Sequence, residues 1–264
     1  MALITDADKV YAGAVAADRA YQGANLVWSS WSEPVPAAPV YWLRADGITG
    51  LADGAAVTTW PAVQGAAAVK NPNAISSPTY VASGRNGRPT VRFGDTSTLL
   101  MPGLGAALAN RADYAVFYVG ATNAIGNYPV VVTAPQGTAW TWLIEYNIDG
   151  NWYWGSNNGM YNLYHPSVLN TNGMWRMFSH VMTAGSPQMW IDGGACSVSG
   201  TGPNGPLAGA VPSSVGSNML LGGYYANNLG LSGDIAEIIF YDRALTGTER
   251  QQVETYLRGK WGLP

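Results

Sequence analysis

The chain has 264 residues and a formal net charge of −3, with 47% hydrophobic and only 11% charged residues. This composition excludes wholesale disorder, and the 13 basic residues form no cluster that could track a nucleic-acid backbone. The single cysteine, Cys196, excludes an internal disulfide, and no run of about 18 apolar residues predicts a membrane span. Frequent glycine (33), tryptophan (11) and tyrosine (15) instead favour an all-β protein, because aromatic residues pack on sheets and glycines form turns.

The chain starts with a ten-residue repeat. Residues 8–13 (DKVYAG) are followed by residues 18–23 (DRAYQG), and Leu26-Val27-Trp28 comes next. Each unit predicts a short strand that carries an aromatic residue and ends in a glycine turn. Strands of this length are marginally stable alone, so residues 1–28 either fold back onto the main domain or dock onto another chain.

This repeat resembles the N-terminal segments of bacteriophage tail and virion proteins. The resemblance implies that residues 1–28 bind other virion proteins, with Tyr11, Tyr21 and Trp28 as the anchoring residues. Residues 1–8 have neither a basic region nor a long apolar stretch, so we expect no signal peptide and predict that the protein is made in the host cytoplasm. Its predicted location is the virion, an extracellular particle.

A proline-rich linker is predicted at residues 29–39. Pro34, Pro36 and Pro39 lack amide hydrogens and favour extended geometry, so this segment predicts a semi-rigid spacer. The sequence therefore divides into a docking segment (1–28), a linker (29–39) and a main domain (40–264).

The main domain reads as a series of short strands with turn signals about eight to twelve residues apart, which is typical of a β-sandwich. Residues 114–119 form an apolar run long enough for a central strand. Alternation over 138–146 places Trp140, Trp142, Ile144 and Tyr146 on one face, which predicts a core position, as it does for Trp152 and Trp154. The predicted strands are 40–43, 58–60, 90–93, 114–119, 138–146, 151–154, 175–182, 188–191, 219–221 and 235–241.

One helix is predicted near residue 264. Thr246 and Glu249 match a capping box, in which hydroxyl and carboxylate satisfy two backbone amides, and Leu245 precedes the cap as a hydrophobic staple. Four apolar residues then recur at helical spacing and predict a face that lies on the sandwich: Val253, Tyr256, Leu257 and Trp261.

Residues 231–263 resemble the closing element of concanavalin A-like lectin/glucanase domains, in particular the laminin-G-like branch of bacterial surface and phage proteins. The motifs are Gly-Asp-Ile-Ala-Glu (233–237), Tyr-x-Arg-Ala-Leu (241–245) and Lys-Trp-Gly-Leu (260–263), and residues 40–46 and 78–93 agree with them. The resemblance covers roughly residues 39–264. It implies a jelly-roll sandwich of two antiparallel sheets with a C-terminal helix, and adhesion to carbohydrate, without identifying the ligand.

An active site is not expected. A glycosidase needs two carboxyl groups about 5–9.5 Å apart, whereas strand residues four apart, such as Glu145 and Asp149, are separated by about 13 Å. Asp234 and Glu237 are three apart and would point to opposite faces unless a bulge intervenes, and the resemblance makes them structural. The two histidines, His165 and His180, form no zinc motif, and Cys196 is predicted to be an inert thiol. No catalytic residue and no metal ligand is therefore predicted.

A structural calcium site is left open only as an assembly of separate loops. Asp53, Asp95 and Asp192 could contribute oxygen ligands, although the sequence has no ladder of such ligands. No other cofactor is expected.

Tyrosine and asparagine residues between positions 153 and 165 suit carbohydrate, because sugars stack on aromatic rings and amides hydrogen-bond to hydroxyls. Residues 155–165 show no strand pattern and are predicted to form a loop, and 224–228 form a second Tyr/Asn cluster. Such residues also serve contacts between subunits, and the sequence leaves both interpretations open. The candidate carbohydrate-binding residues are Tyr153, Asn157, Asn158, Tyr161, Tyr164, His165, Tyr224, Tyr225 and Asn227.

These observations predict a non-enzymatic structural protein of a bacteriophage virion, most simply a minor tail protein whose lectin-like domain binds a host-surface glycan. Alternatives are a capsid decoration or cement protein that binds no sugar, a glycan hydrolase of the same fold, and a free bacterial carbohydrate-binding module. Neither nucleic acid nor membrane is an expected partner. A homo-oligomer is compatible with the sequence, although no coiled-coil heptad supports one.

Overall fold

The structure is a computed structural model. It describes the backbone of five short strands before residue 30 and of residues 39–122, 129–136, 139–146, 152–156, 159–164, 173–199, 201–202, 205–206, 211–223 and 230–264. Side chains are described over 39–122, 129–134, 173–197, 211–223 and 230–264, and at Trp142, Ile144 and Trp154.

The N-terminal repeat forms strands, as predicted. Strands β1 (Ile4–Asp6), β2 (Lys9–Ala12) and β3 (Val15–Ala16) make one small antiparallel sheet, and β4 (Arg19–Gln22) pairs with β5 (Asn25–Ser29). Tyr11, Tyr21 and Trp28 belong to β2, β4 and β5. Within the described residues these strands pair only with one another. The docking role, and a domain boundary in the linker, stay predictions, since residues 30–38 lie outside the described part of the chain.

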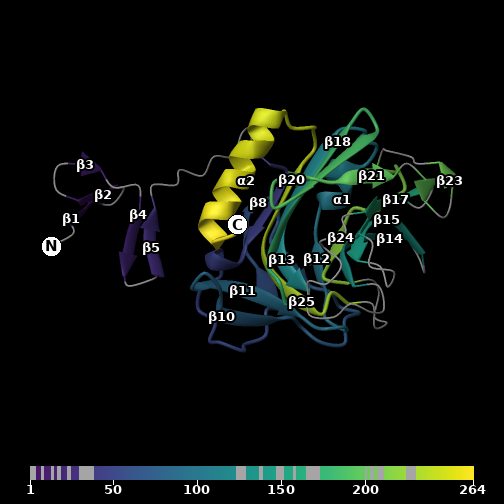
Figure 1. Cartoon of the computed structure of the whole chain (residues 1–264). Helices are drawn as coiled ribbons and strands as arrows, with labels where there is room; N and C mark the ends of the chain where they lie inside the picture. Colours follow the sequence, from purple (N-terminus) through teal and green to yellow (C-terminus); the bar gives the residue numbers. More distant parts are fainter. Residues whose placement is uncertain are drawn as a thin grey trace.

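The main domain is an all-β sandwich of two antiparallel sheets with a C-terminal helix, as the sequence predicted (Figure 1). The first sheet has β13 and β25 at its centre, which confirms the central position expected for residues 114–119. Its strands, in spatial order, are β10 (Thr79–Arg85), β11 (Arg88–Phe93), β25 (Gly233–Tyr241), β13 (Tyr114–Thr122), β18 (Arg176–Thr183), β19 (Ser186–Ile191) and β20 (Gly194–Ala195), while β6 (Tyr41–Arg44) pairs with β25 and with β8 (Ala62–Gln64).

The second sheet contains the tryptophan-rich strands. In spatial order it consists of β21 (Ser197–Ser199), β17 (Gly159–Tyr164), β16 (Trp152–Ser156), β15 (Ala139–Tyr146), β14 (Val130–Gln136), β24 (Met219–Leu221), β12 (Leu99–Met101), β9 (Ala68–Lys70) and β7 (Thr59–Trp60). The remaining elements are η1 (Ala45–Gly47), α1 (Leu104–Leu108), the pair β22 (Thr201–Gly202) and β23 (Gly205–Pro206), and α2 (Gly247–Trp261).

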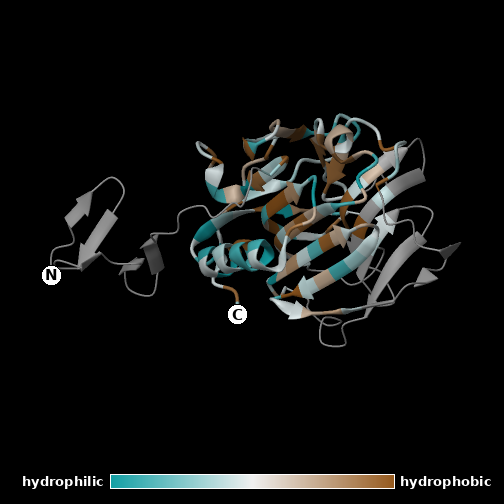
Figure 2. Cartoon of the chain, turned by 90° about the horizontal axis from the view of Figure 1, so that it is seen from above, coloured by the Kyte–Doolittle hydropathy of each residue, from teal (hydrophilic) through white to brown (hydrophobic). Residues whose placement is uncertain are grey.

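Two apolar clusters lie on opposite faces of the first sheet. The inner one fills the sandwich and contains Trp142 and Trp154, which confirms their predicted core positions. The outer one lies beneath α2, where Val253, Tyr256, Leu257 and Trp261 are all buried as predicted. All nine residues of β13 and of β25 are therefore buried, and the visible side of α2 is hydrophilic (Figure 2). The helix covers the outer face of the first sheet, and the second sheet covers its inner face.

The capping box of α2 is present as predicted. The Thr246 hydroxyl accepts a hydrogen bond from the Glu249 amide (3.3 Å), and the Glu249 carboxylate accepts one from the Thr246 amide (2.8 Å). Hydrogen bonds from Arg243, and then from Thr246, lower the pKa of Glu249 to about 2. Leu245 is buried in the outer cluster, in agreement with its predicted contribution to the start of the helix.

Two local predictions were wrong. Residues 159–164 form strand β17 and not a loop, because only two residues separate them from β16 and the two segments close as a hairpin. Trp140 does not follow the alternation of Trp142 and Ile144. A register shift between Ala134 and Pro135 pairs Trp142 with Ala134 but Trp140 with Pro135, so an extra residue lies between the two tryptophans.

Candidate functional site

The predicted carbohydrate-binding residues concentrate on the β16–β17 hairpin. Tyr153 lies in β16, and Tyr161 and Tyr164 lie in β17, beside β21 at the edge of the second sheet. Their side chains are not among those described. The other candidates lie outside the described residues: Asn157, Asn158, His165, Tyr224, Tyr225 and Asn227.

The backbone register separates two of these tyrosines. Tyr161 is paired with Trp154, and Trp154 in turn with Ile144, both of which are fully buried in the inner cluster. Tyr153 occupies the alternate position, in a cross-strand row with Glu145 and Asn162. Because cross-strand partners share a sheet face, Tyr161 holds a core register position and Tyr153 a position on the opposite face. Of the predicted binding residues, this register favours Tyr153, and it adds two row neighbours that were not predicted, Glu145 and Asn162.

The carboxylates Asp234 and Glu237 lie on one face of β25, contrary to simple alternation. Val119 pairs with Glu237 while the next residue, Gly120, pairs with Ile235, so Ala236 is the extra residue of a β-bulge. Ile235 faces the inner cluster, whereas Asp234 and Glu237 both lie on the outer face. Simple alternation predicts opposite faces for these two carboxylates, and the bulge reverses that expectation.

The Asp234 carboxylate is nevertheless engaged by an arginine of the same chain. Arg92 of β11 donates two hydrogen bonds to its carboxylate, at 2.8 and 3.0 Å, and this contact raises the pKa of Arg92. The Asp234 side chain is buried, while that of Arg92 is half exposed. Such a bidentate pair fixes the carboxylate against the neighbouring strand.

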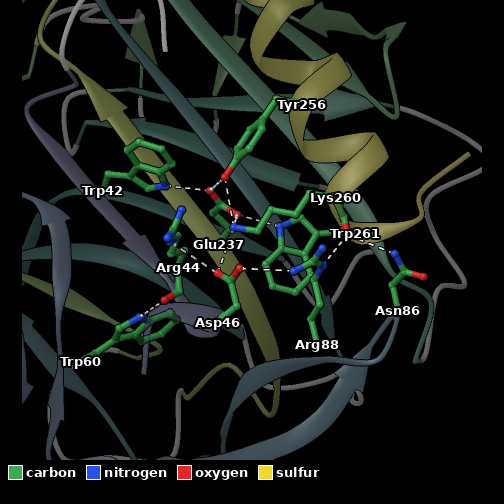
Figure 3. Close-up of polar contacts among 10 residues, drawn as sticks. All are labelled: Trp42, Arg44, Asp46, Trp60, Asn86, Arg88, Glu237, Tyr256, Lys260 and Trp261. Atoms are coloured by element: carbon green, nitrogen blue, oxygen red, sulfur yellow. Dashed lines mark hydrogen bonds and ion pairs between the residues drawn. The ribbon is translucent and has the colours of Figure 1, made fainter. Parts of the chain in front are cut away.

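Glu237 lies in a closed cage of four donors (Figure 3). Trp42 Nε1 (2.7 Å) and the Tyr256 hydroxyl (3.0 Å) donate to Oε1, and Lys260 Nζ and Trp261 Nε1 (both 2.8 Å) donate to Oε2. Glu237 is completely buried. Its carboxylate thus joins β6, β25 and α2 and is closed to any external ligand, which agrees with the structural role that the resemblance implied. Burial, followed by the Glu237 charge, raises the pKa of the Tyr256 hydroxyl.

The C-terminal end of α2 is held by residues of the β10–β11 hairpin. Arg85 Nε donates to the carbonyl of Trp261 (2.9 Å), and Asn86 and Arg88 donate to that of Lys260 (3.1 and 3.2 Å). These donors satisfy helix carbonyls that have no partner within the helix, and the arginines add favourable positive charge there.

The described residues contain no group of three or more His, Cys, Asp or Glu side chains able to hold a metal ion. Asp53 accepts a hydrogen bond from the Ala82 amide (2.8 Å), while Asp192 accepts from Arg176 (2.6 Å) and from the Met177 amide (2.9 Å). These two carboxylates therefore serve separate turns, and the described structure does not bring Asp53, Asp95 and Asp192 together. The pair Glu145 and Asp149 lies beyond the described side chains.

His180 and Cys196 lack the surroundings of reactive groups. His180 is completely buried, with its ring centroid 4.8 Å from that of Trp154, and burial lowers its pKa to about 3. Burial likewise raises the pKa of the Cys196 thiol to about 11. His180 is therefore a neutral core residue, and Cys196 is a thiol with little thiolate at neutral pH, in agreement with the prediction for Cys196.

The residues that surround Glu237 were not predicted from the sequence. Trp42 lies 195 residues from Glu237 in the chain, and the only available signal was that Glu237, Lys260 and Trp261 belong to the same motif-bearing segment. Within the described chain, no helix is both long and apolar enough to cross a membrane.

No known protein family matches the sequence, and no curated protein is similar to it. Solved structures do resemble it. Domain 4 of AbnA, an extracellular GH43 arabinanase from Geobacillus stearothermophilus in complex with arabinotriose, matches 83% of this chain and 97% of its own, with a TM-score of 0.57 and 15% identity. The likeness shows the fold alone.

Two further matches cover only parts of larger proteins. Trypanosoma rangeli sialidase matches with a TM-score of 0.52 and 12% identity over 83% of this chain, which spans about a third of the sialidase (33%). The binding domain of botulinum neurotoxin serotype G matches with a TM-score of 0.55 and 10% identity, over 86% of this chain and 54% of that domain. The β-sandwich of this chain therefore also occurs in an arabinanase, a sialidase and a neurotoxin.

Proposed function

We propose that residues 40–264 form a non-enzymatic carbohydrate-binding domain, carried by a minor tail protein of a bacteriophage and anchored in the virion through residues 1–28. The observation that carries the proposal is the cross-strand row Glu145–Tyr153–Asn162, at register positions that alternate with the buried core. A register row of an acidic, an aromatic and an amide residue suits a sugar, which offers C–H faces for stacking and hydroxyls for hydrogen bonds.

The fold supports the same proposal. Domain 4 of AbnA, of which the match covers 97%, has been solved in complex with arabinotriose. A sandwich of similar fold also occurs within a sialidase. A non-enzymatic role is supported by the state of Asp234 and Glu237, because Arg92 holds the former and four donors enclose the latter. Neither carboxylate is available as the acid or nucleophile of glycoside hydrolysis.

The placement in a phage particle rests on the N-terminal repeat. Its strands β1–β5 pair among themselves within the described residues, as expected of a separate docking segment. Deletion of residues 1–28 should abolish incorporation into particles and leave the melting temperature of the sandwich unchanged. Normal incorporation of the deleted protein would contradict the anchoring role.

To test sugar binding, the full chain is displayed in many copies on one support and titrated with a panel of bacterial cell-wall polysaccharides. The multiple copies reproduce the avidity that a virion would provide. Tyr153→Ala should weaken binding about tenfold or more, which corresponds to about 1.4 kcal/mol, whereas Tyr153→Phe keeps the ring and should retain most of it. Thr255→Ala, on the exposed side of α2, is the control variant.

Three outcomes would count against the proposal. If the multivalent chain binds no polysaccharide, a decoration or cement protein is favoured. In that case we expect the Tyr153 variants to impair particle assembly. Release of reducing ends from a bound polysaccharide would make the protein a glycan hydrolase. Binding that Tyr153→Ala leaves intact would remove the site from the β16–β17 hairpin.

A further inference from the structure

Three ionisable side chains meet beneath the C-terminal helix. Lys260 of α2 places Nζ 2.9 Å from Oδ1 of Asp46, in η1, and 2.8 Å from Oε2 of Glu237, in β25 (Figure 3). Lys260 and Glu237 are buried, and the Asp46 side chain is only 17% exposed. An amine, a carboxyl group and a second carboxylate are thus held together in a largely buried site.

The two contacts of Lys260 differ in kind. Glu237 accepts a hydrogen bond from Nζ and has both oxygens saturated by donors. Oδ1 of Asp46 is buried yet accepts no hydrogen bond from any residue that the structure describes, although Nζ lies 2.9 Å away. The approach of the nitrogen to the Asp46 carboxyl group therefore lacks hydrogen-bond geometry, and the amine is held in direct contact with the group that it would attack.

We propose that Lys260 and Asp46 condense to an intramolecular amide, with Glu237 as the proton-transfer group. Glu237 takes a proton from the Lys260 ammonium, and the freed lone pair attacks Cγ of Asp46 to form the N–C bond. The bond from Cγ to one carboxylate oxygen then breaks. That oxygen leaves as water with two of the three ammonium protons, relayed by Glu237, so ammonium and carboxylate become one amide and one water. No oxidant, metal or other reactant is required.

The surroundings select Asp46 as the acceptor. Replacing a Glu237 oxygen would destroy an acceptor shared by two donors in a fully enclosed cage, whereas Asp46 reaches the surface and its oxygen can leave as water. Arg44 and Arg88 lie 3.7 and 3.6 Å from the Asp46 carboxylate, where they would stabilise the negative charge that develops on the tetrahedral intermediate.

The aromatic wall holds the amine in place. Lys260 Nζ lies 5.0 Å from the Trp261 ring centroid and 5.4 Å from that of Tyr256, and it donates to the Tyr256 hydroxyl at 3.0 Å. Trp42 packs edge-on against Tyr256, with centroids 6.1 Å apart. Fixed reactants in a largely buried site make an otherwise slow condensation effectively unimolecular. The amide would bind the start of the sandwich covalently to its final helix.

Intact-mass spectrometry of the purified full chain tests the proposal. We expect a mass lower than that of the sequence by one water, about 18 Da, which is a covalent change that no folding interaction mimics. Trypsin should then yield a branched peptide that joins residues 45–70 to 259–264, because an acylated lysine is not cleaved. A chain with the full sequence mass, or a water loss that maps elsewhere, would overturn the proposal.

Variants separate the chemistry from the fold. Lys260→Arg and Asp46→Ala should show their full sequence masses, and so should Glu237→Gln in folded protein, verified by circular dichroism. Asp46→Asn should still form the amide but lose ammonia, about 17 Da, in place of water. Water loss that persists in Glu237→Gln would refute the role of Glu237, and the absence of ammonia loss in a folded Asp46→Asn chain would refute Asp46 as the acceptor.

Discussion

The buried imidazole of His180 makes the stability of the sandwich sensitive to mild acid. His180 lies in β18, packs against Trp154 of the other sheet, and hydrogen-bonds to the backbone of Val116. Burial lowers its pKa from the ordinary value of 6.5 to about 3. Because the unfolded chain binds this proton at a higher pH than the folded chain, the folded state loses stability as the pH falls from about 6.5 to about 3.

The size of the effect follows from the two pKa values. At pH 7 the unfolded His180 is mostly neutral, and at pH 5 it is almost fully protonated, whereas the folded side chain is neutral at both. Integrating the difference in bound protons between these pH values gives a loss of about 2 kcal/mol in the free energy of unfolding that is due to His180 alone.

Urea denaturation at pH 7 and pH 5, compared between the wild type and His180→Gln, isolates this contribution. The glutamine amide is uncharged at both pH values, and the remaining titrating groups are common to both proteins, so their contributions cancel. The wild type should lose about 2 kcal/mol more than the variant between pH 7 and pH 5. Equal losses in the two proteins would refute the neutral, buried state of His180.

Three further predictions concern the helix and the thiol. Leu257→Ala should lower the free energy of unfolding by about 2–5 kcal/mol, because Leu257 is fully buried, whereas exposed Gln251→Ala should change it by less than about 0.5 kcal/mol. Thr246→Ala should cost about 1 kcal/mol in the same urea assay and Thr246→Asp much less, unless the capping box is not formed. Cys196 should react slowly with iodoacetamide at pH 8 and faster as the pH approaches 11, and rapid labelling of the folded protein at pH 8 would contradict its raised pKa.

Much of the fold was predictable because apolar residues alternate where strands form. The runs at 114–119 and 235–241 predict β13 and β25, and Thr246 with Glu249 predicts the start of α2. In each case the local pattern and the tertiary packing agree. Periodicity alone carries this information, since burial on a sheet repeats every two residues and burial on a helix about every 3.6.

The errors arose where one residue changes the register. Strand β17 was interpreted as part of a loop because the connection before it, Asn157-Asn158, lies within a run of glycine and asparagine that is typical of loops. The bulge at Ala236 decides on which face Glu237 lies, and a bulge depends on the paired strand and not on the bulged sequence. The cage around Glu237 required Trp42, Tyr256 and Lys260 to meet, which only the tertiary structure determines.

The central position of β25 bears on how the protein is made. This strand pairs with β6, β11 and β13, yet it is the last strand in the sequence, so a ribosome releases all three partners before it. Until residues 233–241 emerge, those partners have open edges and uncovered apolar faces, the features by which nascent chains aggregate or recruit chaperones. A chain terminated before β25 would therefore yield an insoluble fragment instead of a smaller working domain.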